Sequence, residues 1–168
     1  MEAPSLFLKK ILTFQKNGKV LDLAMGRGRN SFFLAQNGYE IDGIELSKES
    51  IAECQRKIEI THLPVKIIEA DLEKTALPEN TYDLVICFFY LQRDLFPQIK
   101  AALKKNGFVV YETFLIDQHL QHGSPRRVEF CLGHNELLNF FRDFRVHFYE
   151  EGKGEGDKIT ARIIAQKN

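Results

Sequence analysis

The segment Lys19–Asn30, KVLDLAMGRGRN, decides the fold that this sequence predicts. A hydrophobic strand over Val20–Ala24 runs into a turn that contains Gly26 and Gly28, and helical spacing begins directly after it. Glycine at these two positions permits a tight turn and a close approach of a ligand to the backbone. The helix that follows presents free N–H groups and the positive end of its dipole to the turn. Taken alone, the motif fits either a ligand-binding loop or a plain tight turn between a strand and a helix.

Short β-rich runs alternate with stretches of helical spacing along the first two thirds of the chain. The expected strands are Val20–Ala24, Glu40–Glu45, Val65–Glu69, Tyr82–Phe89 and Phe108–Phe114, and the expected helices are Ser31–Asn37, Lys48–Ile60 and Arg93–Leu103. We interpret Asn17-Gly18 and Asn106-Gly107 as helix stops. This alternation predicts a doubly wound, Rossmann-like, mostly parallel sheet with helices on both faces.

The two ends of the chain follow a different pattern. Residues 1–17 predict an N-terminal helix, with Pro4 and Ser5 as its start signals. The last third predicts a helix, two strands and the loop that joins them, over Asn135–Phe141, Phe144–Glu150, Ile159–Ala165 and Gly152–Asp157. Two strands joined by a short glycine-rich loop form an antiparallel hairpin. We therefore expect a single α/β domain over residues 1–168, whose mixed sheet ends in an antiparallel hairpin strand.

Composition excludes several classes of function. A length of 168 residues argues for one domain, and 23 basic against 23 acidic residues exclude nucleic-acid binding through bulk positive charge. The cysteines Cys54, Cys87 and Cys131 are odd in number and widely spaced, so neither a disulfide framework nor a zinc site is expected. No apolar run reaches about 18 residues, and Lys9 and Lys10 interrupt the N-terminal apolar stretch. We expect a cytoplasmic protein without a membrane segment or a metal.

Acidic residues fall at the carboxyl ends of the first three expected strands. Glu45 comes 23 residues after Asp22, close to the spacing of a carboxylate that holds ribose hydroxyls. Asp71 could accept a hydrogen bond from the exocyclic amine of adenine, with Leu46 and Leu72 against the faces of the ring. Each acid by itself could equally be a solvated strand end or a helix cap. Because open α/β sheets bind ligands at the carboxyl ends of their strands, the three acids together favour a ligand site.

Four segments carry a family resemblance: VLDLAMGRGRNSFFLA, DGIELS, EADLEKTALPENTYDLVICFFYLQ and LKKNGFVVYETF. In them the chain resembles the class I S-adenosylmethionine-dependent methyltransferases, and most of all the small tellurite-resistance-type methyltransferases. The resemblance implies S-adenosyl-L-methionine as cofactor and S-adenosyl-L-homocysteine as product. By position, it implies that the cofactor-binding residues are Asp22, Ala24, Gly26, Gly28, Asn30, Glu45, Leu46, Asp71, Leu72 and Phe88. Ala24 replaces the more usual first glycine, so we expect this residue to keep a negative φ.

The acceptor of the methyl group is less defined. In-line displacement at a sulfonium depends mainly on positioning, and a general base is needed only when the nucleophile must lose a proton, so no catalytic residue is assigned. Candidate substrate contacts are Tyr90 and Arg93 after the fourth strand, and Arg126 and Arg127 in the irregular segment 115–133, which we expect to form a lid. The two lid arginines could instead be a solvated pair. We expect a small-molecule acceptor, such as a thiol or a chalcogen oxyanion, rather than nucleic acid.

Two other hypotheses about the function stay open at this point. A nicotinamide-dependent oxidoreductase would share the glycine-rich turn and the acid of the second strand, although Ser31 occupies the position of the third glycine. A non-catalytic methyltransferase-like scaffold would keep the fold and only bind the cofactor or a partner. The sequence does not indicate an oligomeric state.

Overall fold

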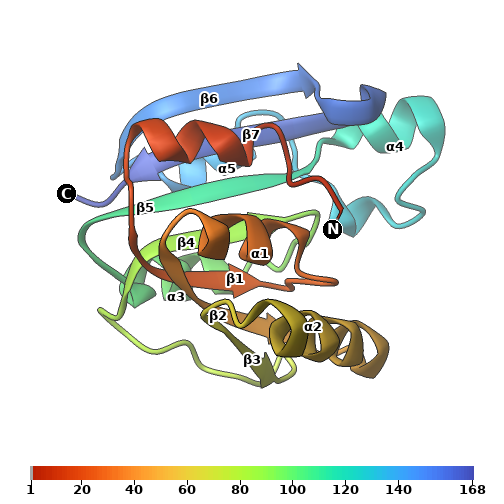
Figure 1. The fold of residues 1–168 in the computed structure, drawn as a ribbon. Coiled ribbons are helices and arrows are strands. Elements are labelled where there is room, and N and C mark those ends of the chain that lie inside the picture. The colour runs from red at the N-terminus through yellow and green to blue at the C-terminus, as the bar shows by residue number, and fades with distance from the viewer. Residues whose placement is uncertain (1) are drawn as a thin grey trace.

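One seven-stranded sheet, in the order β3-β2-β1-β4-β5-β7-β6, forms the centre of the computed structural model, which describes residues 2–168 (Figure 1). Its strands are β1 (Gly18–Leu23), β2 (Tyr39–Glu45), β3 (Val65–Glu69), β4 (Tyr82–Phe88), β5 (Leu103–Phe114), β6 (Arg145–Lys153) and β7 (Ile159–Gln166). The first five strands are parallel, whereas β7 is antiparallel to both β5 and β6. The predicted mixed sheet with its antiparallel C-terminal hairpin is confirmed.

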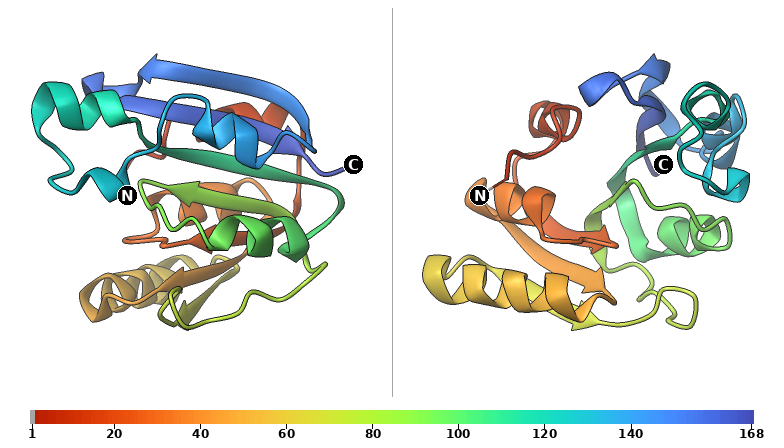
Figure 2. Two further views of the ribbon diagram at one scale, coloured as in Figure 1. Left: turned by 180° about the vertical axis from the view of Figure 1, so that it is seen from behind. Right: turned by 90° about the vertical axis from the view of Figure 1, so that its right-hand side faces the viewer.

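Helices cover both faces of this sheet, as the end-on view in Figure 2 shows. One face carries the 3₁₀ helix η1 (Leu8–Thr13) with α1 (Arg29–Gln36) and α2 (Lys48–Thr61), and the other carries α3 (Leu95–Ala102) and α5 (Glu136–Phe140). The shorter elements are α4 (Ile116–His122) and the 3₁₀ turns η2 (Val128–Phe130) and η3 (Glu155–Asp157). No helix among residues 2–168 combines the length and the apolarity that a membrane span requires.

Alternation along the central strands divides the core into two clusters. Leu84 and Ile86 of β4 pack in the cluster under η1 and α1, whereas Val85 and Cys87 pack in the cluster under α3 and α5. Because both faces are covered, β4 is apolar along nearly its whole length. On the η1 and α1 face, the polar residues Asp22 of β1 and Glu112 of β5 follow the apolar ones towards the carboxyl ends of their strands.

The predicted N-terminal helix over residues 1–17 is wrong in extent. Only Leu8–Thr13 is helical, as a 3₁₀ helix, and Met1 lies outside the described residues. Ser5 does not start a helix, because its backbone N–H donates to Asn30 Oδ1 (3.0 Å) and its hydroxyl lies 3.4 Å from Glu112 Oε2. These bonds hold the first described residues near the carboxyl ends of the parallel strands, as the red end of the ribbon in Figure 1 shows.

Asn106-Gly107 is also not the helix stop that we expected. Helix α3 ends at Ala102 and β5 begins at the next residue, so the Asn-Gly pair lies inside the strand. The register with β4 shifts there, and Asn106 takes a φ of +64°. The dipeptide signals a left-handed backbone conformation correctly, but a β-bulge uses that conformation as readily as a helix end does. Likewise, β6 continues through Lys153, and the expected loop at Gly152–Asp157 is a 3₁₀ turn over its second half.

Candidate functional site

The turn after β1 has a left-handed backbone at three positions. Ala24, Gly26 and Gly28 have φ values of +55°, +56° and +76°. The expectation of a negative φ at Ala24 is therefore wrong, and an L-residue in this conformation costs about 1–2 kcal/mol. Gly28 is the N-cap of α1, and a Cβ there would lie 2.8 Å from the ring of Phe32. Gly28 thus serves close packing of the turn on the helix.

Glu45, the last residue of β2, holds this turn through its carboxylate. Oε2 accepts the N–H of Gly26 at 2.8 Å, and Oε1 accepts the N–H groups of Leu46 and Ser47, both at 2.8 Å. A carboxylate has about four lone-pair sites, so about one, on Oε2, remains for a ligand hydroxyl. A second hydroxyl would require Glu45 to release a backbone N–H.

Asp22 lies beneath the same turn and is 3% exposed. Its Oδ2 accepts a hydrogen bond from the Ser31 hydroxyl at 2.6 Å. Burial raises the pKa of the Asp22 carboxyl to about 7, against the effect of the Ser31 hydrogen bond; Glu45 raises it further and Arg29 lowers it. A buried carboxyl that titrates near neutral pH next to a cavity is typical of a site that receives a ligand charge.

Two cavities meet at this turn, and Ala24 lines both. The first, of about 210 Å³, is lined by Glu2, Asp22, Ala24, Met25, Gly26, Arg27, Arg29, Asn30, Phe88 and Phe89. The second, of about 160 Å³, is lined by Ala24, Ile44, Glu45, Leu46, Ala70, Asp71, Leu72 and Tyr90. The first is polar and the second is mostly apolar, so together they suit a ligand with one charged end and one flat apolar end.

The structure therefore brings together all the residues that the resemblance implied for the cofactor, except that Gly28 lies behind the turn and lines neither cavity. Leu46 is 59% exposed at the rim of the apolar cavity, where a flat ring would cover it. Asp71 accepts the N–H of Glu73 at 3.0 Å and pairs with Lys74 at 3.1 Å, and these bonds lower the pKa of its carboxyl. An amine of the ligand would have to share Asp71 with Lys74.

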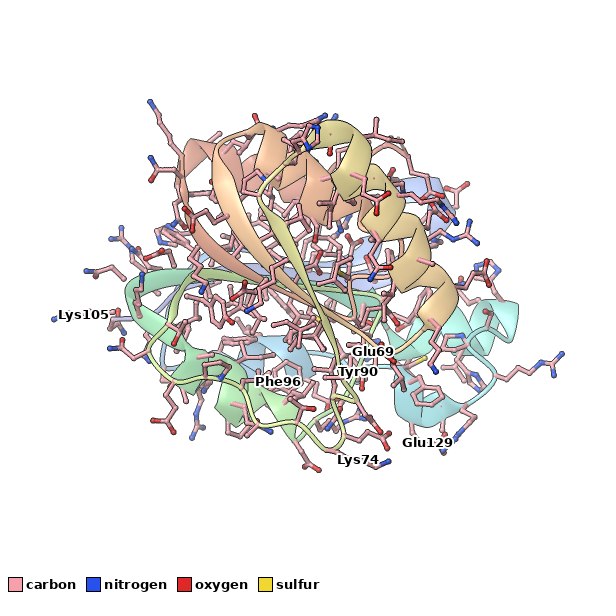
Figure 3. All side chains as sticks on the ribbon, turned by 60° about the horizontal axis from the view of Figure 1, so that its bottom comes forward. Glu69, Lys74, Tyr90, Phe96, Lys105 and Glu129 are labelled. Atoms are coloured by element: carbon pink, nitrogen blue, oxygen red, sulfur yellow. The ribbon has the colours of Figure 1, made fainter. Side chains whose placement is uncertain are left out.

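The residues expected to contact the substrate lie apart from one another. Tyr90 lines the apolar cavity beside Asp71 and Leu72, near Glu69 at the end of β3 in Figure 3, so it lies with residues that the resemblance implied for the cofactor. The Arg93 guanidinium is occupied within the protein by Glu136 (2.6 Å) and by the carbonyls of Glu129 and Cys131. Arg93 thus anchors the segment 115–133 rather than presenting a free cation.

The segment 115–133 folds into α4 and η2 beside the carboxyl ends of the strands. Arg126 is exposed, and Arg127 pairs with Glu129 at 3.0 Å on the exposed surface. Neither arginine lines one of the two cavities. Closure of this segment over the site stays a prediction. No group of three or more His, Cys, Asp or Glu side chains among residues 2–168 is arranged to hold a metal.

Sequence reasoning missed two buried charged residues on the face that carries α1, Glu112 of β5 and Arg162 of β7, which are 2% and 9% exposed. Both interrupt apolar strands, VVYETF and ITARIIA, on a face where their strand neighbours are core residues. A charge within an otherwise buried strand could have drawn attention to them.

The strain at Ala24 gives a first testable prediction. Ala24→Gly should raise the free energy of unfolding by about 0.5–1 kcal/mol, since glycine relieves the left-handed strain but loses more entropy on folding. The melting temperature should rise by about 1–4 °C in a thermal melt. Ala52→Gly, inside α2, is the matched control and should lower stability by about 1 kcal/mol. If Ala24→Gly and Ala52→Gly lowered the free energy of unfolding equally, the strain at Ala24 would be contradicted.

Comparisons with known proteins add a family match. The family model described as "Tellurite resistance protein TehB" matches residues 8–164. A Haemophilus influenzae protein described as a probable S-adenosyl-L-methionine-dependent methyltransferase TehB is 28% identical over 142 residues, which are 82% of this chain and 49% of that protein. A 23S rRNA (uracil(747)-C(5))-methyltransferase of Pyrococcus abyssi is 35% identical over 72 residues, which are 43% of this chain and 18% of that protein. The chain thus spans about half, or less, of the length of these relatives.

Solved structures agree with the architecture. The crystal structure of TehB from Haemophilus influenzae superposes with a TM-score of 0.81 at 22% sequence identity, and the match covers 96% of this chain and 61% of that one. This likeness shows that the two chains share the fold.

Proposed function

Because this chain belongs to the tellurite resistance protein TehB family, we propose that it transfers the methyl group of S-adenosyl-L-methionine to a small-molecule acceptor. The observation that carries the proposal is the pair of cavities that meet at Ala24, one polar and one apolar; Glu45 lines the apolar cavity and accepts the N–H of Gly26, which lines the polar one. The apolar cavity suits adenine between Leu46 and Leu72. The polar cavity suits the amino-acid end of the cofactor, whose ammonium group would neutralise buried Asp22.

Methyl transfer from a sulfonium depends mainly on positioning and requires little acid–base chemistry from the protein's side chains. Bound S-adenosylmethionine supplies a methyl group on a sulfonium; the lone pair of the acceptor forms the new bond, and the electron pair of the broken C–S bond stays on sulfur as S-adenosylhomocysteine leaves. The chain would hold the two reactants in line, and Phe88 and Phe89 beside the polar cavity would exclude water from it. A thiolate or an oxyanion acceptor needs no general base.

Calorimetric titration and turnover together test this function. We expect S-adenosylmethionine to bind with a 1:1 stoichiometry, and labelled methyl to pass to at least one member of a panel of thiols, chalcogen oxyanions, halides, phenols and amines. A preference for a nicotinamide cofactor would contradict the proposal in favour of an oxidoreductase. Tight binding without transfer to any acceptor would favour a non-catalytic scaffold.

A short RNA belongs in the same panel, because one relative of this chain is by its description an rRNA methyltransferase. A formal net charge of zero favours a small molecule over RNA, since it offers no bulk attraction to phosphates. Transfer to the RNA alone would contradict the small-molecule acceptor while leaving the methyl transfer intact.

A further inference from the structure

Two arginines, Arg27 and Arg29, line the polar cavity, but only Arg27 pairs with a carboxylate among residues 2–168. The Arg27 guanidinium lies 3.0 Å from Glu49 and 3.2 Å from Glu53, both on α2. Arg29 forms no salt bridge within the described part of the chain, although the residue is half-buried. A partly buried guanidinium without an anionic partner, at the wall of a cavity, is suited to an anionic group of a ligand.

Asn30, the next residue of α1, adds hydrogen-bond donors to the same cavity. The residue is 5% exposed and lines the cavity. Its Oδ1 accepts the N–H of Ser5 at 3.0 Å, and this bond identifies the amide oxygen, because an N–H can donate only to the oxygen of the amide. Nδ2 thus keeps its two N–H donors for another partner. Arg29 and Asn30 also begin α1, whose positive dipole end favours an anion.

Asp22 supplies the opposite charge beside these donors. Ser31, the residue after Asn30, donates its hydroxyl to Asp22 Oδ2 at 2.6 Å, and this bond ties the end of β1 to the first turn of α1. Burial raises the pKa of the Asp22 carboxyl, whereas Arg29 is close enough to lower it. The cavity therefore holds an acceptor for a cation and donors for an anion side by side. An amino acid, whose ammonium and carboxylate groups share one carbon atom, requires this arrangement.

We propose that Arg29 binds the carboxylate of S-adenosyl-L-methionine, with the Nδ2 group of Asn30 beside it, while Asp22 binds the ammonium group. The inference rests on the methyl transfer proposed above and names the residue that recognises one end of the cofactor. Charged contacts to two groups on one carbon atom fix the orientation of the amino-acid end, and with it the position of the sulfonium.

Arg29 is then a specificity-determining residue for the cofactor. A molecule that keeps the adenosine, the sulfur and the ammonium group but lacks the carboxylate leaves the Arg29 guanidinium without a partner and places a second cation beside it. Arg27 does not take over this role, because Glu49 and Glu53 already hold its guanidinium. The protein should therefore discriminate between cofactor analogues that differ only in the carboxylate.

Calorimetric titration with three thioethers, at a pH above the pKa of Asp22, tests this assignment. S-adenosylhomocysteine carries both charged groups, its decarboxylated analogue lacks only the carboxylate, and its deaminated analogue lacks only the ammonium group. We expect the native protein to bind S-adenosylhomocysteine about 10-fold or more tighter than the decarboxylated analogue, as for a charged hydrogen bond.

Substitutions at the two charged residues should have separate effects on these preferences. Arg29→Met should bind S-adenosylhomocysteine about 10-fold or more weakly, while its affinity for the decarboxylated analogue should not fall. Arg29→Lys should keep part of the preference for the carboxylate, because an ammonium group pairs with a carboxylate without the two parallel bonds of a guanidinium. Asp22→Asn should lose the preference for the ammonium group and keep that for the carboxylate. Arg56→Met, which removes an exposed positive charge from α2, is the control and should change neither preference.

The outcomes separate this inference from the proposed function. Absence of S-adenosylhomocysteine binding by the native protein would contradict the proposed function itself. Normal binding without a preference for the carboxylate, or a preference that survives in Arg29→Met, would overturn only the assignment of Arg29. Equal losses of affinity for S-adenosylhomocysteine and its decarboxylated analogue would also overturn it, because Arg29 would then only support the turn. A melting transition like that of the native protein establishes that Arg29→Met is folded; otherwise Arg29→Gln replaces it and should show the same loss of preference.

Discussion

Glu45→Ala should weaken the binding of S-adenosylmethionine at least about 100-fold, because two losses coincide at this carboxylate. The variant lacks the acceptor for a ribose hydroxyl, and it also frees the backbone N–H groups of Gly26, Leu46 and Ser47 that the carboxylate holds at 2.8 Å. A turn that already contains left-handed Ala24 would then have to be ordered by the ligand alone. Calorimetric titration at fixed salt measures the loss.

Glu49→Ala is the matched control for this prediction. Glu49 lies four residues further on and pairs with Arg27 at 3.0 Å, but its side chain is 81% exposed. Exposed ion pairs contribute little, about 0–1 kcal/mol, so the affinity of this variant should stay within about 2-fold of the native value. Equal losses of affinity for S-adenosylmethionine in Glu45→Ala and Glu49→Ala would show that the effect comes from net charge in general. Glu45 would then not be a cofactor-binding residue.

The fold could be predicted from the sequence because its signals are local. The apolar run of β4 and the glycine-rich turn after β1 each depend on a few consecutive residues, and the family match agrees with the resemblance that they carry. The two expectations that were wrong, at Asn106-Gly107 and in the N-terminal stretch, each have a physical reason. Asn106-Gly107 specifies a backbone conformation, not the element that uses it, and the N-terminal stretch is fixed by Ser5 bonding to Asn30 and Glu112, far away in sequence.

Some residues of the candidate site could likewise be predicted from the sequence, and others could not. Asp22, Glu45 and Asp71 could be found because each lies at or just after the carboxyl end of its own strand, and parallel strands bring their carboxyl ends to one edge. Arg93 looked like a substrate contact because its partner Glu136 is distant in sequence. The Glu112–Arg162 pair could not be found from spacing, since it requires the antiparallel register of β5 and β7, which only the folded sheet defines.

Asp22→Asn should have opposite effects on stability and on affinity. Because the pKa of Asp22 is about 7 in the folded protein and 3.8 in the unfolded reference, the folded state holds this proton more tightly. The stability that this proton contributes is complete below pH 3.8 and is lost as the pH rises through about 7. Asparagine keeps the shape and the Ser31 contact without the charge, so the variant should melt several degrees above the native protein at pH 8 and only slightly above it at pH 4.

Affinity should change in the other direction, since the cationic end of S-adenosylmethionine needs the ionised carboxylate. Native affinity should increase from pH 6 to pH 8, with proton release on binding near pH 7, whereas Asp22→Asn should bind about 10- to 100-fold more weakly at pH 8 and with little pH dependence. Calorimetry in two buffers of different ionisation enthalpy measures the released protons. Asp42→Asn, a buried aspartate bonded to Tyr82 near the amino ends of the strands, should leave the affinity unchanged. If Asp22→Asn binds as tightly as the native protein at pH 8, the charge on Asp22 does not contribute to binding of the cofactor.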